Sequence, residues 1–271
     1  MRFAGKCIIV TGSNSGIGKA TALLFAKEGA SVLIHGRNME TLEKTVDECK
    51  RIGTETAKFP MVQGCFEENG FLKRIFDTAL AEFGKIDILV NNAGMDEPST
   101  AIVGSEDVFD RQINCILKAP IFLSQLCFPE LKKSKGIVIN VSSMAGTRPF
   151  VIGSTFYSIA KAALNQFTQC AGIEMGSEGV RVNAVCPGYV DTPMFYTHER
   201  GEERTKETKA RLEILSKCVP INKIGTAEET AKLIAFIASD DASMMNGACI
   251  VQDGGNTLMG LDTQTIENAA K

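Results

Sequence analysis

The sequence lacks the features of membrane, secreted and nucleic-acid-binding proteins. No apolar run approaches the roughly 18 residues of a membrane span, and residues 1–6 are too short for a signal peptide. Basic residues do not exceed acidic ones, because 29 Lys and Arg against 32 Asp and Glu leave a net charge of −3. We therefore expect a cytoplasmic protein with no membrane span and no nucleic-acid partner.

The nine cysteines lack the pattern of a disulfide framework or a metal site. Their number is odd, they are widely scattered, and no two of them form a C-x-x-C pair. Such cysteines are typical of buried free thiols in a reducing compartment. We expect no bound metal.

No repeat, low-complexity tract or interdomain linker divides the chain. Its 271 residues, 44% of them hydrophobic, suffice for one large domain, so we expect a single domain over 1–271. A charged stretch interrupts the pattern at about 194–223 and is a candidate lid over a substrate site, although a solvated helix face has the same composition. Residues 256–271 form a C-terminal tail.

Seven short apolar runs alternate with longer amphipathic segments. They occupy residues 7–10, 31–35, 59–63, 86–90, 136–141, 180–185 and 248–251. Continuously apolar runs of this kind predict strands of a parallel sheet that is covered on both faces. With right-handed crossovers, the sequence predicts an α/β, Rossmann-type doubly wound fold with a seven-stranded parallel sheet. Ligands of such sheets bind at the carboxyl ends of the strands.

A glycine-rich turn follows the first predicted strand and precedes a predicted helix. Backbone N–H groups at such a helix start can bind a phosphate, whereas the alternative is a plain tight turn. The glycines are spaced G-x-x-x-G-x-G, one residue longer in the first interval than the common dinucleotide turn. The predicted cofactor-binding residues here are Gly12, Ser13, Asn14, Ser15, Gly16, Ile17 and Gly18.

Tyr157 and Lys161 lie four residues apart in a helix predicted over about 155–175, so their side chains share one face. A phenol titrates near pH 10, and lowering its pKa to near 7 requires roughly 4 kcal/mol. A cation about 4 Å away supplies roughly that amount at an effective dielectric constant of about 20. Tyr196 and Arg200 have the same spacing, but they lie in the charged stretch and are interpreted as a surface pair.

Taken together, several motifs resemble the short-chain dehydrogenase/reductase family, and they occur in the family's order along nearly the whole chain. They are the turn at 11–18, the Asn-Asn-Ala-Gly sequence at 91–94, Asn114, Ser143, Tyr157 with Lys161, and residues 187–192. The chain is similar to the single-domain NAD(P)-dependent branch, with its 3-oxoacyl-ACP reductase-like and glucose or steroid dehydrogenase-like members. A hydride would then pass between the nicotinamide and a ketone or secondary alcohol.

The resemblance implies four catalytic residues. Tyr157 exchanges the proton, Ser143 orients the substrate oxygen, and Lys161 lowers the phenol pKa and binds the nicotinamide ribose. Asn114 anchors a proton-relay water, although from the sequence alone it reads as an exposed residue of a helix over 106–126. Ser142 competes with Ser143 and is disfavoured, because it would lengthen an interval to Tyr157 that is already longer than usual.

Further cofactor contacts are implied after the third, fourth and sixth strands. The residues concerned are Cys65, Phe66, Asn92, Ala93, Gly94, Pro187, Gly188, Val190 and Thr192. Cys65 stands where relatives usually carry an Asp that binds adenine, so that contact is lost or taken over by Glu67.

Arg37 decides the expected form of the cofactor. NAD-dependent relatives place an Asp about 20 residues beyond the turn, whereas this chain has Gly36 followed by Arg37. A guanidinium suits the 2′-phosphate of NADP. We therefore expect NADP(H) rather than NAD(H), the alternative being that Arg37 is a surface residue at a helix start.

The substrate is expected to be a small carbonyl or alcohol compound. Apolar residues in segments that border the cleft in relatives favour an apolar or amphipathic ligand: Phe150, Val151, Ile152, Tyr189, Met194 and Phe195. Relatives are usually homotetramers, so the resemblance also implies a homo-oligomer. The competing hypothesis is a catalytically inactive dinucleotide-binding regulatory or scaffold protein.

Overall fold

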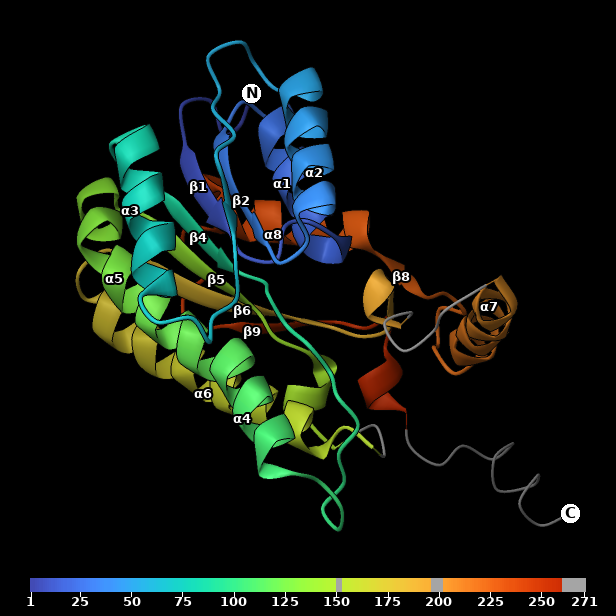
Figure 1. Cartoon of the computed structure of the whole chain (residues 1–271). Coiled ribbons are helices and arrows are strands. Elements are labelled where there is room, and N and C mark those ends of the chain that lie inside the picture. The colour runs from blue at the N-terminus through green and yellow to red at the C-terminus, as the bar shows by residue number, and fades with distance from the viewer. Residues whose placement is uncertain (150–152, 196–201, 260–271) are drawn as a thin grey trace, which may run out of the picture.

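The computed structural model describes residues 1–149, 153–195 and 202–259. A central sheet of seven parallel strands runs through the molecule in the order β3-β2-β1-β4-β5-β6-β9 (Figure 1). The strands are β1 (Cys7–Val10), β2 (Ser31–Gly36), β3 (Met61–Gln63), β4 (Ile88–Asn91), β5 (Ile137–Val141), β6 (Arg181–Pro187) and β9 (Cys249–Gln252). All seven predicted strands are confirmed, and the strand order reverses between β1 and β4.

Helices cover both faces of the sheet, as the sequence predicts. On one face lie α1 (Gly16–Lys27), α2 (Met39–Ile52) and α8 (Ala227–Ala238). On the other face lie α3 (Phe71–Phe83), α4 (Glu106–Ile113), α5 (Ala119–Ser134) and α6 (Thr155–Gly176), at the left of Figure 1.

Side chains along β1 point alternately to the two faces of the sheet, which explains why the strand is apolar throughout. Ile8 and Val10 pack into the core beneath α1 and α8, whereas Ile9 packs into the core beneath α3 and α5. Successive strand residues point to opposite faces, and both faces here are dry. A continuously apolar run is therefore required rather than an alternating one.

The helix predicted over 106–126 begins at Glu106 but is interrupted. A π-helical turn, Asn114–Lys118, separates α4 from α5, and within it the Ala119 N–H donates to the carbonyl of Asn114 five residues earlier. Pro120 directly follows and has no N–H with which to continue a regular α-helical ladder. Because of Pro120 and the π-helical turn, the segment is not one regular helix.

The predicted lid segment contains a short 3₁₀ turn, Pro193–Phe195, and the helix α7 (Glu202–Lys217), at the right of Figure 1. Between them, residues 196–201 lie outside the described residues, and so do 260–271 of the predicted tail. A separate two-stranded sheet, β7 (Val190–Asp191) with β8 (Gly225–Thr226), brackets this segment. Among the described helices, none is long and apolar enough to cross a membrane.

Candidate active site

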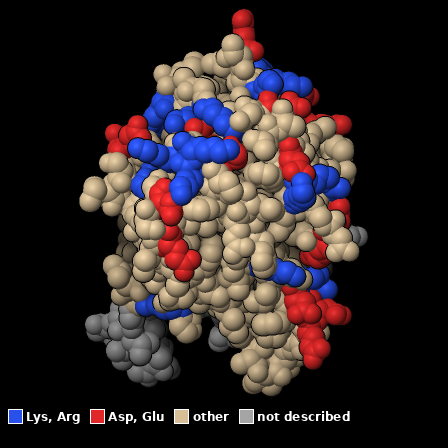
Figure 2. Space-filling view, turned by 90° about the vertical axis from the view of Figure 1, so that its left-hand side faces the viewer, with Lys and Arg blue, Asp and Glu red and all other residues tan. Residues whose placement is uncertain are grey.

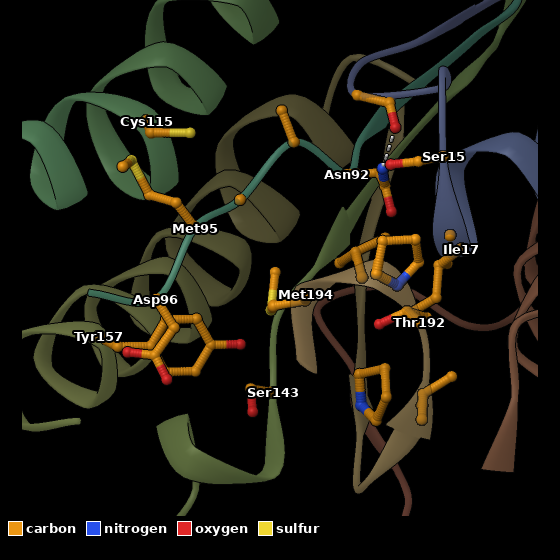
Figure 3. Close-up of a pocket in the computed structure, with 18 of the residues that line it drawn as sticks. Ser15, Ile17, Asn92, Met95, Asp96, Cys115, Ser143, Tyr157, Thr192 and Met194 are labelled. Carbon is orange, nitrogen blue, oxygen red and sulfur yellow. Dashed lines mark hydrogen bonds between the residues drawn. The ribbon is translucent and has the colours of Figure 1, made fainter. Parts of the chain in front are cut away.

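The loops after six of the strands surround one large cavity at the carboxyl edge of the sheet. Its volume is 690 Å³, and its walls come from the segments after β1, β2, β3, β4, β5 and β6. Figure 3 shows Asp96, Tyr157 and Ser143 at one end and Ser15, Ile17 and Asn92 at the other. The cavity lies where the strand order reverses, the position at which doubly wound sheets bind their ligands.

The glycine turn forms the floor of this cavity. Gly12 has a φ of +63°, and a Cβ built on it would lie 2.9 Å from the Cα of Ala93. No other residue fits so closely against the neighbouring chain in that conformation. Ser15, Gly16 and Ile17 line the cavity at the start of α1, where the Ser15 side chain makes no capping hydrogen bond. The helix start thus offers backbone donors to a phosphate.

Two of the predicted cofactor-binding residues, Ser13 and Gly18, do not line the cavity. Ser13 is fully buried, its hydroxyl donating to the Val10 carbonyl at 2.7 Å and accepting from the His35 N–H at 2.9 Å. Gly18 is buried inside α1. Neither lines the cavity, so their contribution is to support the turn from behind.

His35, on β2, connects the glycine turn to the segment after β3. The sequence did not predict these two contacts. Its Nδ1 accepts from the Gly12 N–H at 3.1 Å, and its Nε2 lies 3.3 Å from the Gly64 carbonyl. Burial lowers the pKa of His35 to about 4, so the imidazole is neutral and donates from Nε2. Both partners are backbone groups, which leave no signal in the sequence.

Arg37 and the loop after β3 line the far end of the cavity. A Cβ on Gly36 would collide with the side chain of Asn14, which donates to the Thr41 hydroxyl at 2.9 Å. Gly36 therefore brings no side chain into the cavity, and the exposed Arg37 follows it at the cavity wall. On the facing loop, Cys65 and Phe66 also line the cavity, together with Gly64 and Glu67.

The segment after β4 is tied to the glycine turn. The Thr11 hydroxyl accepts from the N–H groups of Asn92 and Ala93, at 3.0 and 3.1 Å. In return, the Asn92 side-chain amide donates to the Thr11 carbonyl at 2.8 Å. These bonds hold Asn92, Ala93 and Gly94 against the cavity, which all three line.

The segment after β6 closes the cavity from the other side. Pro187, Gly188, Val190 and Thr192 all line it, as the resemblance implies. A Cβ on Gly188 would lie 2.7 Å from the Cβ of Asp253, so glycine lets this turn pass close to the end of β9.

Lys161 is buried beneath the cavity, with a relative exposure of 3%. Its ammonium donates to the Val141 carbonyl at 2.7 Å and lies 5.5 Å from the centre of the Tyr157 ring. Burial lowers the pKa of Lys161 to about 8, so the group still carries its charge at neutral pH. Tyr157 and Lys161 thus face the cavity from one side of α6, as their spacing predicts.

The phenol of Tyr157 is protonated at neutral pH. Burial raises the pKa of Tyr157 to about 12, the hydrogen bond with Ser143 lowers it, and the charge of Asp96 raises it. Burial dominates the pKa of Tyr157 in this structure, and the lowering of that pKa by the buried Lys161 ammonium stays a prediction.

Ser143, rather than Ser142, is the hydroxyl beside this phenol. Ser143 makes the hydrogen bond to Tyr157 and also accepts from the Ala145 N–H at 3.1 Å. The Ser142 hydroxyl donates to the Lys161 carbonyl at 3.2 Å. Ser142 therefore fastens the end of β5 to α6, and Ser143 lies at the reacting end of the cavity (Figure 3).

Asn114 does not line the cavity. It is partly buried in the π-helical turn, and the neighbouring Cys115 lines the cavity instead. Burial raises the pKa of the Cys115 thiol to about 11, so this thiol is not a nucleophile at neutral pH.

The predicted substrate residues divide into described and undescribed ones. Tyr189 and Met194 line the cavity. Phe195 ends the turn Pro193–Phe195. Outside the described residues lie Phe150, Val151, Ile152 and the pair Tyr196 and Arg200.

Further cavity residues were not predicted: Met95, Asp96, Pro98, Cys115, Met144, Arg211 and Leu215. Met95 and Asp96 directly follow the Asn-Asn-Ala-Gly motif and Pro98 lies two residues further on, and that position is the only sequence signal for them.

Comparison with known proteins places the chain in a family. Residues 12–257 match the family model described as enoyl-(acyl carrier protein) reductase. A 3-oxoacyl-[acyl-carrier-protein] reductase of Thermotoga maritima is 36% identical over 258 residues, which cover 94% of this chain and 99% of the relative. The chain belongs to the short-chain dehydrogenase/reductase family.

Solved structures of short-chain dehydrogenases/reductases have the same fold. One from Caenorhabditis elegans, of unknown function and with cofactor, is 35% identical with a TM-score of 0.88, covering 98% of this chain and 99% of that one. One from Burkholderia cenocepacia, in complex with NADP, is 28% identical with a TM-score of 0.84, covering 95% and 100%. As a short-chain dehydrogenase/reductase, the protein is an oxidoreductase that acts on CH–OH or C=O groups.

Proposed function

We propose that the protein is an NADP(H)-dependent oxidoreductase that transfers a hydride between the nicotinamide and a ketone or secondary alcohol, with Tyr157 as general acid and base. The observation that carries this proposal is the meeting of Ser143, Tyr157 and Lys161 at one end of a cavity whose other end carries Arg37. The cradle built on Gly12 fits a dinucleotide, because it leaves backbone donors at the start of α1, whose first residue, Gly16, has no side chain.

Each catalytic residue has a defined task. The bound nicotinamide supplies or accepts the hydride. In reduction, the protonated Tyr157 phenol donates its proton to the carbonyl oxygen, which the Ser143 hydroxyl orients. Lys161 stabilises the phenolate left behind through its positive charge. Asn114 is assigned to the water that returns the proton, from its place in the π-helical turn packed against α6.

Replacing Tyr157 with Phe tests the reaction directly. Removing the hydroxyl takes away the proton donor, so turnover of a responsive ketone with NADPH should fall by about a thousandfold. The dissociation constant for NADPH, measured by its fluorescence, should stay unchanged. Tyr189→Phe is the comparison variant, because it removes a second phenol that lines the cavity within the described part of the chain.

The same experiment separates the enzyme from the scaffold alternative. Undiminished turnover in Tyr157→Phe would refute the mechanism. A protein that binds NADPH but turns over no member of a ketone and alcohol panel would favour a dinucleotide-binding regulator.

Cofactor choice is assigned to Arg37. Its exposed guanidinium lines the cavity after a glycine, and a relative of known structure binds NADP. Losing a charge-assisted bond to the 2′-phosphate of about 1.5–3 kcal/mol should lower kcat/KM for NADPH by at least about tenfold in Arg37→Ala. Values for NADH should not change.

Arg51→Ala is the control for Arg37, since Arg51 is exposed near the end of α2 and does not line the cavity. Steady-state kinetics with both cofactors provide the measurement. If the parent protein prefers NADH and Arg37→Ala keeps that preference, the assignment to NADP is wrong.

A further inference from the structure

Arg211 occupies a position on α7 that faces the cavity. It lies three residues after Thr208 and four before Leu215, so these three side chains share one face of the helix. Thr208 and the adjacent Leu212 are buried, and Leu215 lines the cavity together with Arg211. The side chain of Arg211 is itself exposed, and it borders the cavity at the edge of this helix face.

No acidic side chain of the described residues forms an ion pair with Arg211. By contrast, Arg2, Arg74 and Arg111 each pair with a carboxylate, and the guanidinium of Arg181 donates to backbone carbonyls. Arg211 therefore keeps its donors available to a molecule in the cavity.

The lining of the cavity carries charged side chains of both signs, among them Asp96 and Arg211. Asp96 lies near the phenol, where its charge raises the pKa of Tyr157. The Ser154 hydroxyl donates to the Asp96 carboxylate at 2.8 Å and thereby holds it just before α6. On the α7 side, the charge of Arg211 acts on Tyr189 and lowers the pKa of that phenol, against the raising effect of burial.

This polarity orients a charged substrate. An anionic group near the reacting end would be repelled by Asp96, and the same group near α7 would be attracted by Arg211. A guanidinium matches the oxygen atoms of a carboxylate or a phosphate.

We propose that Arg211 binds an anionic group of the substrate, a carboxylate or a phosphate, so that the enzyme prefers keto acids or phosphorylated ketones to neutral ketones. This inference rests on the proposed function for its catalytic readout. It adds to that function the class of substrate and a residue that determines specificity.

Matched pairs of ketones test the preference in steady-state assays with NADPH. Acetoacetate and levulinate are compared with their methyl esters, and dihydroxyacetone phosphate with dihydroxyacetone. For the carboxylate pairs or for the phosphate pair, kcat/KM of the parent protein should be at least about tenfold higher for the anionic ketone than for its neutral counterpart. The pair that shows the larger preference identifies the anionic group.

Variants of α7 assign the preference to Arg211. Arg211→Gln should abolish it by raising KM for the anionic ketone while leaving kcat and the neutral ketone unchanged, and Arg211→Lys should restore part of it. Lys209→Gln is the matched control, because Lys209 is exposed on the same helix and does not line the cavity.

Binding to the NADPH complex of Tyr157→Phe supplies a second readout that does not need turnover. Calorimetric titration should show tighter binding of the anionic ketone, which Arg211→Gln removes. If this discrimination appears without turnover in the parent protein, the proposed reaction fails and the anion site stands. The assignment of Arg211 to the substrate is overturned if the two members of every pair bind equally well. It is also overturned if Arg211→Gln raises the dissociation constant for NADPH.

Discussion

At the scale of single residues, burial decides the protonation state of the groups around the cavity. His35 is neutral because it is enclosed, and both of its ring nitrogens are engaged by the glycine turn and by Gly64. Lys161 stays charged although its pKa falls to about 8. The sequence names these residues, but only their surroundings tell which form each one takes.

His35 makes stability depend on pH. Its pKa is about 4 in the folded protein against an ordinary value of 6.5, so the unfolded chain binds more protons between these values. The contribution of His35 is therefore complete above pH 6.5 and is lost as the pH falls towards 4, by about 3 kcal/mol.

Urea unfolding of the parent protein and of His35→Gln across this pH range measures the effect. The parent should lose free energy of unfolding more steeply than the variant as the solution is acidified. Equal slopes would show that His35 does not carry the dependence, since carboxylates such as Glu68 are common to both proteins.

At the scale of elements, the start of α8 is joined to the cavity through a small sheet. The Thr226 hydroxyl accepts from the Glu229 N–H, and the Glu229 carboxylate accepts from the Thr226 N–H, forming a capping box. Thr226 also pairs with Asp191 of β7, next to the cavity residues Val190 and Thr192. One cap thus holds both a helix and a wall of the site.

Thr226→Ala should lower the free energy of unfolding by about 1 kcal/mol, because the helix loses its side-chain cap. Thr226→Ser is the control, since it keeps the hydroxyl. Chemical denaturation measures both variants. A serine variant as destabilised as the alanine variant would indicate that the lost methyl group, and not the cap, is responsible.

The π-helical turn between α4 and α5 could not be predicted from the sequence. The sequence predicts a helix beginning at Glu106, which the structure confirms, but its periodicity does not reveal the extra residue in the turn at Asn114. Such a turn depends on how α4 and the turn itself pack against α6. Helical spacing alone cannot show that Cys115, rather than Asn114, reaches the cavity.

At the scale of the whole molecule, one face is poor in charge. Figure 2 shows Lys, Arg, Asp and Glu interspersed on the side of the molecule that lies at the left in Figure 1, with a broad uncharged area between them. Large apolar side chains are exposed on the helices: Phe109 on α4, Phe122 on α5, and Ile159 and Ile173 on α6. We predict that these exposed apolar side chains take part in contacts between subunits.

These residues support the homotetramer that the resemblance implies. We expect light scattering coupled to size-exclusion chromatography to give the mass of four chains. Ile159→Asp should yield smaller species, because it places a charge in the contact. Ile52→Asp on α2, away from this face, should leave the mass unchanged, and a monomeric parent protein would contradict the prediction.

The sequence by itself determined the seven strands, the doubly wound fold, the glycine turn and the Tyr157–Lys161 pair. It could do so because apolar runs, glycines and the Tyr157–Lys161 spacing are local patterns that a parallel sheet brings to one edge. The other predicted residues of the cavity lining were implied by the family resemblance. The tertiary structure decided what depends on distant segments. It turned Ser13 and Gly18 away from the cavity, set the protonation of His35 and Tyr157, and brought Arg211 and Asp96 to the lining of one cavity, since burial and electrostatic interaction follow from three-dimensional neighbours.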